Sequence, residues 1–498
     1  MTPSHDLFLL IKNLSGAEKR YFKVWAQRHV IGEKNKYEQL FDLIDALPDH
    51  EPYNETNLKQ QLTDEQMLKN FADEKKNLHE LVMKAMRSFY HDKTIDHQID
   101  NLLLDEEFYR QKRLNNLRQK AIDKGKKLAV KYDKLPALLT LIEREMTLQI
   151  EWQQDELKTL SDRINLQEQQ ALNQLQILAS LRYFSNRLFI QVRISTAQSS
   201  ELLRKESSRI LQEPIVKNYQ PGNNFHADRH YYRIHAMHHR IHRHMDQHQH
   251  YTKLVFELYD IHFPHQQQNS PSSYKISLFN YLNACFAAGD LKPFPALLKK
   301  ARAIPATNRD EEGEDWQNLI HLELIYLSNM GLLNQATQMA TDIETGLKKY
   351  AHKVNMARQL AICYNLAAAF FVSGQWNRAL DYYLKILQDK TDARQDLKTN
   401  SELLQLAIQY ELKNYDLAEY QLRNIERRFA KQPDKEDYKL FFKYLRQLIK
   451  DPAATHSPDQ EKLNASLARQ AELLCWVQAK QQKKKIEEVF RQTTLTAL

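Results

Sequence analysis

The sequence predicts an all-α protein, built as a solenoid of antiparallel helix pairs with a helical cap at its N-terminus. The chain has only nine glycines and fourteen prolines in 498 residues, which indicates few tight turns. Good helix formers such as Leu, Lys, Gln, Glu and Ala dominate, and no run of alternating β-branched residues is long enough to make a sheet. A pattern of two helices joined by a short turn also recurs with a period of about 40 residues, which is typical of a helical repeat array.

The clearest copy of this pattern lies in Leu366–Leu387. Gly374 heads it, and Trp376, Ala379 and Tyr383 follow two, five and nine positions later. The heads of the four copies lie 42, 43 and 39 residues apart. The other copies are Gly289 with Leu291, Phe294 and Leu298; Gly331 with Leu333, Ala336 and Ala340; and Lys413, in place of glycine, with Tyr415, Ala418 and Leu422.

Each position of the pattern has a physical reason. The glycine ends the first helix in a left-handed conformation, the small residue lets two helices approach, and the apolar residue four positions later packs on the next unit. Unrelated hairpins in a plain helical bundle are the alternative. The predicted repeat-structural residues are Gly289, Gly331, Ala336, Gly374, Trp376, Ala379, Tyr383 and Ala418.

Through these residues, Tyr274–Ala430 resembles the tetratricopeptide family. The resemblance implies stacked antiparallel helix pairs with a concave face that binds a partner. The family's repeat is about 34 residues long, and its closing proline is missing here, so longer helices or connections must absorb the excess. Ile304–Trp316 is predicted to be one such connection.

Residues 1–95 are predicted to form the helical cap. Ser15 and Glu18 have the spacing of a capping box at the start of a helix. The opening sequence LIKNLSGAEKRYFK resembles the start of a group of helical-repeat proteins from Bacteroidetes-type bacteria, which supports the architecture and brings no activity with it. A helix-turn-helix fold is the alternative, but no recognition-helix pattern is present. The predicted helices are Asp6–Asn13, Glu18–His29, Tyr37–Leu47, Asn54–Leu62 and Leu68–His91.

Three further regions follow the cap. Residues 96–213 are predicted to be an irregular helical-repeat region, and Pro214–Asn224 a linker. Residues 225–450 are predicted to hold the tetratricopeptide-like repeats. Residues 461–498 are predicted to be a capping helix and tail, since the end of a solenoid needs a polar outer face.

A basic segment, Arg110–Lys134, holds ten Lys or Arg against the two acids Asp123 and Asp133. It could contact phosphates. The solvated face of a helix is the favoured interpretation. The net charge of +8 and the isoelectric point near 9.0 permit nucleic-acid binding without requiring it.

Nine histidines fall between His226 and His250, many three or four positions apart, and pairs on one helical face could chelate a metal ion. No H-E-x-x-H motif and no nearby cysteine support this. The favoured interpretation is the surface of a further repeat, headed loosely by Gln249, so no metal or cofactor is predicted. Titration of these histidines near neutral pH is a further expectation.

The sequence predicts no enzyme, because no nucleophile elbow, phosphate-cradling glycine loop or paired-cysteine motif is present. Cys285, Cys363 and Cys475 are each predicted to be buried thiols. No apolar run reaches the roughly 18 residues of a membrane span, and no signal peptide opens the chain. We therefore expect a cytoplasmic protein without a membrane partner.

The favoured function is a scaffold that binds a protein or peptide on the concave face of the repeats. Asparagine side chains there can hydrogen-bond a peptide backbone. The lysine and arginine set with which the family grips a carboxylate is not found, so capture of a peptide C-terminus is not expected. The alternative is a nucleic-acid-linked regulator with a basic N-terminal half and a repeat domain that senses a peptide or protein. The predicted inward positions are Phe279, Asn280, Asn283, Asn318, His321, Tyr364, Asn365, Asn400 and Tyr410.

Overall fold

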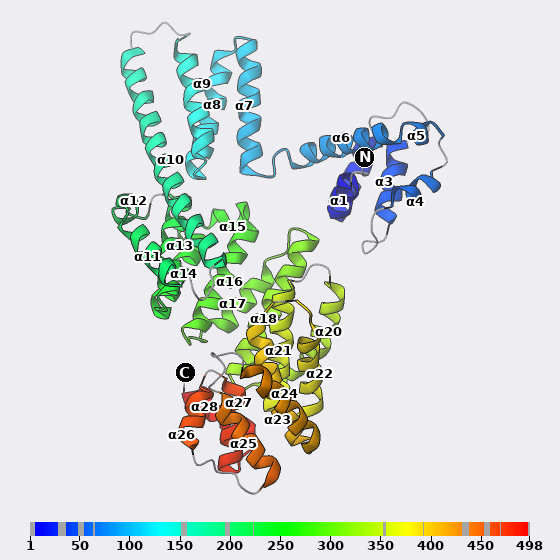
Figure 1. Cartoon of the computed structure of the whole chain (residues 1–498). Coiled ribbons are helices and arrows are strands. Elements are labelled where there is room, and N and C mark those ends of the chain that lie inside the picture. The colour runs from blue at the N-terminus through cyan, green and yellow to red at the C-terminus, as the bar shows by residue number, and fades with distance from the viewer. Residues whose placement is uncertain are drawn as a thin grey trace. The chain divides into compact units, whose positions relative to one another are not determined.

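The computed structural model confirms an all-α protein (Figure 1). Two compact units divide the chain, Met1–Ser277 and Leu278–Leu498, and the division falls inside one helix, α16 (Pro271–Ala287). No strand occurs in the described part of either unit. The structure describes residues 5–27, 36–47, 54–62, 65–150, 157–194, 200–222, 224–351, 355–391, 393–430, 438–452, 459–468 and 470–496.

The N-terminal helices of unit 1 share a core of their own. The rings of Phe22 and Phe41 stack there at 4.5 Å between centroids. The predicted capping box is present, because the Glu18 N–H donates to Ser15 Oγ (3.3 Å) and the Ser15 N–H donates to Glu18 Oε2 (2.6 Å). The helix predicted over Leu68–His91 is broken at Asn70. The helices are α1 (Asp6–Asn13), α2 (Gly16–Gln27), α3 (Lys36–Ala46), α4 (Glu55–Gln60), α5 (Glu65–Lys69) and α6 (Phe71–Tyr90).

The remaining helices of unit 1 run from α7 to the start of α16, and one of them departs from the predicted linker. Pro214–Lys217, within the predicted linker, is helix α12, because proline is well suited to the first turn. Asn224 then caps α13 through its side chain. These helices are α7 (Ile95–Gln111), α8 (Asn115–Lys131), α9 (Leu135–Ile150), α10 (Leu157–Ile194), α11 (Ser200–Gln212), α12, α13 (Phe225–Ile241), α14 (Met245–Glu257), the π-helical η2 (Leu258–His262) and α15 (His265–Asn269).

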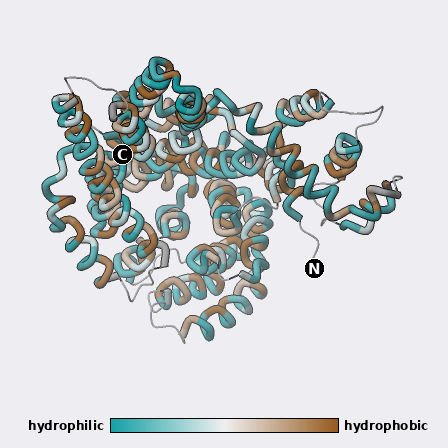
Figure 2. Tube along the Cα trace, turned by 90° about the horizontal axis from the view of Figure 1, so that it is seen from above, coloured by the Kyte–Doolittle hydropathy of each residue, from teal (hydrophilic) through white to brown (hydrophobic). Residues whose placement is uncertain are grey.

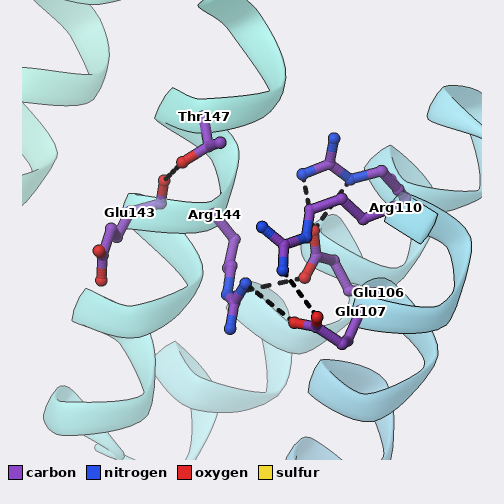
Figure 3. A network of polar contacts seen from close by, with 7 residues as sticks. Glu106, Glu107, Arg110, Glu143, Arg144 and Thr147 are labelled. Atoms are coloured by element: carbon purple, nitrogen blue, oxygen red, sulfur yellow. Dashed lines mark hydrogen bonds and ion pairs between the residues drawn. The ribbon is translucent and has the colours of Figure 1, made fainter. Parts of the chain in front are cut away.

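A buried ion-pair network joins α7, α8 and α9. Arg118 Nε donates to Glu106 Oε1 at 2.9 Å, and both side chains have 0% exposure. Figure 3 shows how Arg144 of α9 reaches the carboxylates of Glu106 and Glu107 on α7, at 3.7 and 3.2 Å. Charged groups therefore link these three helices.

Unit 2 continues from α16 with paired helices. The connection predicted over Ile304–Trp316 is wrong beyond Asn308, because the Asn308 side chain accepts from the N–H groups of Asp310 and Glu311 and starts a helix there. The helices are α17 (Phe294–Ala303), α18 (Arg309–Asn329), α19 (Leu333–Gln338), α20 (Ala340–Lys349), α21 (Met356–Val372), α22 (Trp376–Gln388), α23 (Gln395–Glu411), α24 (Tyr415–Phe429), α25 (Lys439–Lys450), α26 (Gln460–Ser466), α27 (Ala471–Gln482) and α28 (Ile486–Thr496).

All four predicted repeat heads lie in left-handed turns between helices. Gly289, Gly331, Gly374 and Lys413 have φ values of 77°, 68°, 73° and 61°. After each head, the next N–H donates to the carbonyl oxygen five positions earlier, which closes the helix end as a Schellman motif. These bonds join Asp290 to Cys285, Leu332 to Leu327, Gln375 to Phe370 and Asn414 to Gln409, each at 2.9 Å.

The same turn also occurs where the sequence pattern did not predict it. Arg113, Asp133, Arg243 and Lys483 have φ between 53° and 62°, with the same five-residue hydrogen bond after them. The loose repeat head predicted at Gln249 is wrong, since the turn lies at Arg243 and Gln249 is inside α14. Helix pairs with this turn therefore occur in both units.

The small residues of the predicted repeat pattern are buried, as their expected packing role requires. Ala336, Ala379 and Ala418 have 0% exposure, as has Tyr383. Trp376 packs edge-on against Phe371 at 5.4 Å. In Figure 2 apolar and polar residues alternate around the helices, as amphipathic packing demands. Within the described residues, none of the helices combines the length and apolar character that crossing a bilayer requires.

Candidate binding face

Two of the predicted inward positions, Tyr364 of α21 and Tyr410 of α23, pack against α27. The Tyr364 hydroxyl lies 3.4 Å from Glu472 Oε2, and Tyr410 packs edge-on against Trp476 at 5.8 Å between ring centroids. Asn400 is the hydrogen-bond partner of the buried Tyr364 hydroxyl. These three side chains therefore have intramolecular contacts within unit 2.

The positions on α16 do not form a row with those on α18. Phe279 is buried, and the Asn283 amide donates to the Phe279 carbonyl of its own helix at 2.7 Å. Asn280 is exposed to solvent. The open part of the predicted face is therefore found further along unit 2.

A polar cavity of about 450 Å³ opens between α18, α21 and the start of α23. Asn318 and His321 of α18, two of the predicted residues, line it. A third, Asn365 of α21, lies against His321, with its amide nitrogen 3.3 Å from His321 Nδ1. The lining residues are Glu314, Gln317, Asn318, His321, Asn355, Ala357, Arg358, Ala361 and Arg394.

Local sequence explains why these side chains meet. Asn355 caps α21 by accepting from the Ala357 N–H at 2.9 Å, and Gln317 of α18 donates to the Asn355 carbonyl at 3.0 Å. Arg394 precedes α23 in a left-handed conformation with φ of 52°. Two helix starts are thereby held beside the middle of α18.

Two arginines dominate the electrostatics of this cavity. Burial, together with the charges of Arg358 and Arg394, lowers the pKa of His321 to about 3, so its imidazole is neutral at physiological pH. Burial and the neighbouring Arg394 also lower the pKa of Arg358. The cavity is therefore basic on the side of α21 and α23, while Glu314 is exposed.

Sequence reasoning missed Gln317, Arg358 and Arg394. The repeat pattern indicates which residues of a first helix face inward, whereas Arg358 and Arg394 lie at helix starts, where chain direction is set by caps. Their meeting depends on the packing of helices distant in sequence, so the chain offers no local signal for it.

A second cavity, of about 550 Å³, lies in unit 1 and is mostly apolar. Ile177, Pro214, Ile215 and Ala227 contribute to its lining. Beside it, Tyr219 donates a hydrogen bond to Asp228 Oδ1 at 2.5 Å. None of the predicted site residues belongs to it.

The basic segment separates into a paired and an unpaired set. Arg110, Arg118, Lys126 and Lys134 form ion pairs with acids of α7 and α9. A second set lies on α8 at intervals of four, three and four residues, and hence on one helical face. This exposed set, without an ion pair among the described residues, is Lys120, Lys124, Lys127 and Lys131.

The histidine segment is largely packed inside unit 1. Burial lowers the pKa of His226, His235 and His238 to about 4, and that of His230 to about 3. The expectation that the segment titrates near neutral pH is therefore wrong for these residues. In the described part of the chain, no cluster of three or more His, Cys, Asp or Glu is placed to hold a metal ion.

The three cysteines are buried thiols, as predicted. Burial raises the pKa of Cys363 and of Cys475 to about 11, so both thiols are protonated at neutral pH. A protonated, inaccessible thiol is a poor nucleophile. These cysteines serve the packing of their helices.

Comparisons with known proteins identified no relative that could help to interpret this cavity. No known protein family matches the chain, and neither a curated protein nor a solved structure matches it significantly. The cavity of unit 2 must therefore be interpreted from its own chemistry.

Proposed function

We propose that the protein is a non-enzymatic scaffold that binds a protein or peptide in the open part of the repeat face of unit 2. We also propose that the helix pairs of α16–α24 stack as a tetratricopeptide-like solenoid, and that the protein is cytoplasmic. The observation that carries the proposal is the polar cavity beside Asn318 and His321. Amide and imidazole groups at its wall can pair with the donors and acceptors of a peptide backbone.

Peptide selection on the immobilised full chain tests this proposal. Peptides selected from a random library should bind the double variant Asn318→Ala/His321→Ala about tenfold more weakly, as expected for the loss of one or two hydrogen bonds. The exposed Asn280 lies outside the cavity, so Asn280→Ala is the control and should retain affinity. The proposal would be refuted if the natural chain, the double variant and the control bound the peptides equally well, or if no peptide were selected.

A second candidate function, a nucleic-acid-linked regulator, draws support from the lysine row of α8. Phosphate contacts release counterions, so the affinity for duplex DNA of arbitrary sequence should fall steeply with salt. The double variant Lys124→Gln/Lys127→Gln should reduce this slope by about one to two. Lys439→Gln/Lys443→Gln changes two exposed lysines one turn apart on α25 and serves as the charge-matched control. Binding that stays constant as salt rises would exclude this function.

A further inference from the structure

Arg358 is a half-buried cation without a counter-ion in the described residues. Its guanidinium lines the cavity of unit 2, yet it forms neither an ion pair nor a hydrogen bond there. A guanidinium offers five N–H donors, and Arg358 supplies them to the cavity without a protein acceptor in the described part of the chain. The cavity therefore favours acceptor atoms that carry negative charge.

Arg394 adds a second positive group on the same side. It is engaged by Asp396, whose carboxylate lies 2.8 Å from Arg394 Nη2. Asp396 is itself more than half exposed, so this pair is weakened by solvent. Like-charge repulsion between the two arginines remains, since the charge of Arg394 lowers the pKa of Arg358.

Neutral donors complete the wall from a third direction. The Asn365 amide nitrogen can only donate, so His321 Nδ1 accepts, and the proton of the neutral imidazole lies on Nε2. Asn318 of the same helix has an amide without a hydrogen-bond partner in the described structure. Donors thus come from α18, from α21 and from the residue that precedes α23.

We propose that this cavity binds a phosphoryl group. A tetrahedral phosphate presents three strong acceptor oxygens, which suit donors that arrive from three segments, whereas a carboxylate accepts mainly in one plane. Its charge compensates Arg358, and the cavity lies at the starts of α21 and α23, where helix dipoles favour an anion. Glu314, the acidic residue of the lining, is exposed, so solvent screens its charge.

The identity of the molecule that carries the phosphoryl group rests on the proposed function. For a peptide-binding scaffold, this molecule is a peptide with a phosphorylated side chain. The anion site itself is independent of that assignment. Inorganic phosphate is therefore the first probe, and a phosphoserine peptide is the second.

Hydrogen–deuterium exchange of the full chain tests the site with sodium phosphate, sodium acetate and sodium chloride at one ionic strength. Phosphate should slow amide exchange in residues 355–361 and 394–400, by about ten times once it reaches ten times its dissociation constant. Arg358→Gln should remove this protection. Arg423→Gln, which breaks an exposed ion pair with Glu419 on α24, should retain it.

The inference is overturned if phosphate gives no protection, if acetate protects equally, or if Arg358→Gln keeps the protection. In the second measurement, the full chain should bind the phosphoserine peptide at least about tenfold more tightly than the same peptide with serine. Protection by inorganic phosphate without that preference would support the phosphate site and contradict the peptide scaffold. The two probes therefore distinguish failure of the phosphate site from failure of the proposed peptide scaffold.

Discussion

At the scale of single residues, buried charge is the feature of unit 1 with the largest expected energetic effect. Glu106 and Arg118 are both fully buried, so each neutralises a charge that water cannot reach. Removing one partner of such a pair strands the other in a medium of low polarity. Replacing both partners avoids that penalty.

We predict that Arg118→Met destabilises the protein by about 3–5 kcal/mol. The double variant Glu106→Leu/Arg118→Met should lose clearly less. Urea denaturation followed by circular dichroism measures both. A double variant as unstable as the single one would show that the pair's hydrogen bonds, and not the stranded charge, matter most.

Gly346 is a residue that close packing alone explains. A Cβ atom at this position would lie 2.1 Å from Trp316 Cζ2, so α20 and α18 approach too closely for any side chain. We predict that Gly346→Ala costs about 1–3 kcal/mol through overpacking. Thermal unfolding and tryptophan fluorescence would detect it.

The matched control is Gly16→Ala in α2. No atom lies within 4 Å of a Cβ built there, so alanine should be neutral or stabilise by about 0.4–1 kcal/mol. If both variants had the same stability, the contact with Trp316 would not be the reason for the glycine.

At the scale of helices and turns, a residue in the left-handed conformation marks the turns between paired helices. Sequence reasoning located four turns because glycine or a phased lysine marks them. It missed those at Arg113, Asp133, Arg243 and Lys483, since the backbone requirement is met there by side chains that give no glycine signal. The pattern thus located four helix pairs correctly but underestimated how many pairs the chain contains.

Substitutions at Gly374 measure how much the left-handed backbone conformation alone costs in stability. Its φ is 73°, and the nearest atom to an added Cβ is 3.9 Å away, so a substitution meets strain and no clash. We predict that Gly374→Ala costs about 1–2 kcal/mol. Gly374→Asn should cost less in the same denaturation experiment, because asparagine tolerates this region. Equal costs would argue against backbone strain.

Helix α13 should make stability depend on pH. Four of its buried or half-buried histidines have folded pKa values of about 3 to 4, below the ordinary value of 6.5, so the unfolded chain binds more protons between pH 4 and 6.5. Stability should therefore fall as pH falls below about 6.5. Asp133 opposes this trend, since burial raises its pKa to about 6, but four histidines outweigh it.

We predict a lower thermal unfolding midpoint at pH 5 than at pH 7. His235 stacks on Tyr251 at 4.7 Å, and His235→Phe keeps a ring there without a titratable group. This variant should lose less stability on acidification than the natural chain. An unchanged pH profile would mean that His235 is not among the groups responsible.

At the scale of the whole molecule, sequence predicted the fold class, the helix pairs and three residues that meet near one cavity. It did not predict that α27 covers Tyr364 and Tyr410, because that contact joins segments more than 60 residues apart. It also missed Arg358 and Arg394, whose proximity is set by helix starts. Local periodicity indicates which way a residue faces, and only tertiary packing decides what it meets.

The central claim is that a partner occupies the open part of the repeat face, beside Asn318 and His321. Photo-crosslinking in native lysate tests it directly, with a benzophenone side chain in place of Glu314 at the cavity rim or of Asn280 outside it. We predict a discrete protein or peptide adduct from position 314, absent from position 280 and lost with Asn318→Ala. No adduct from position 314, or the same adduct from both positions, would contradict the claim.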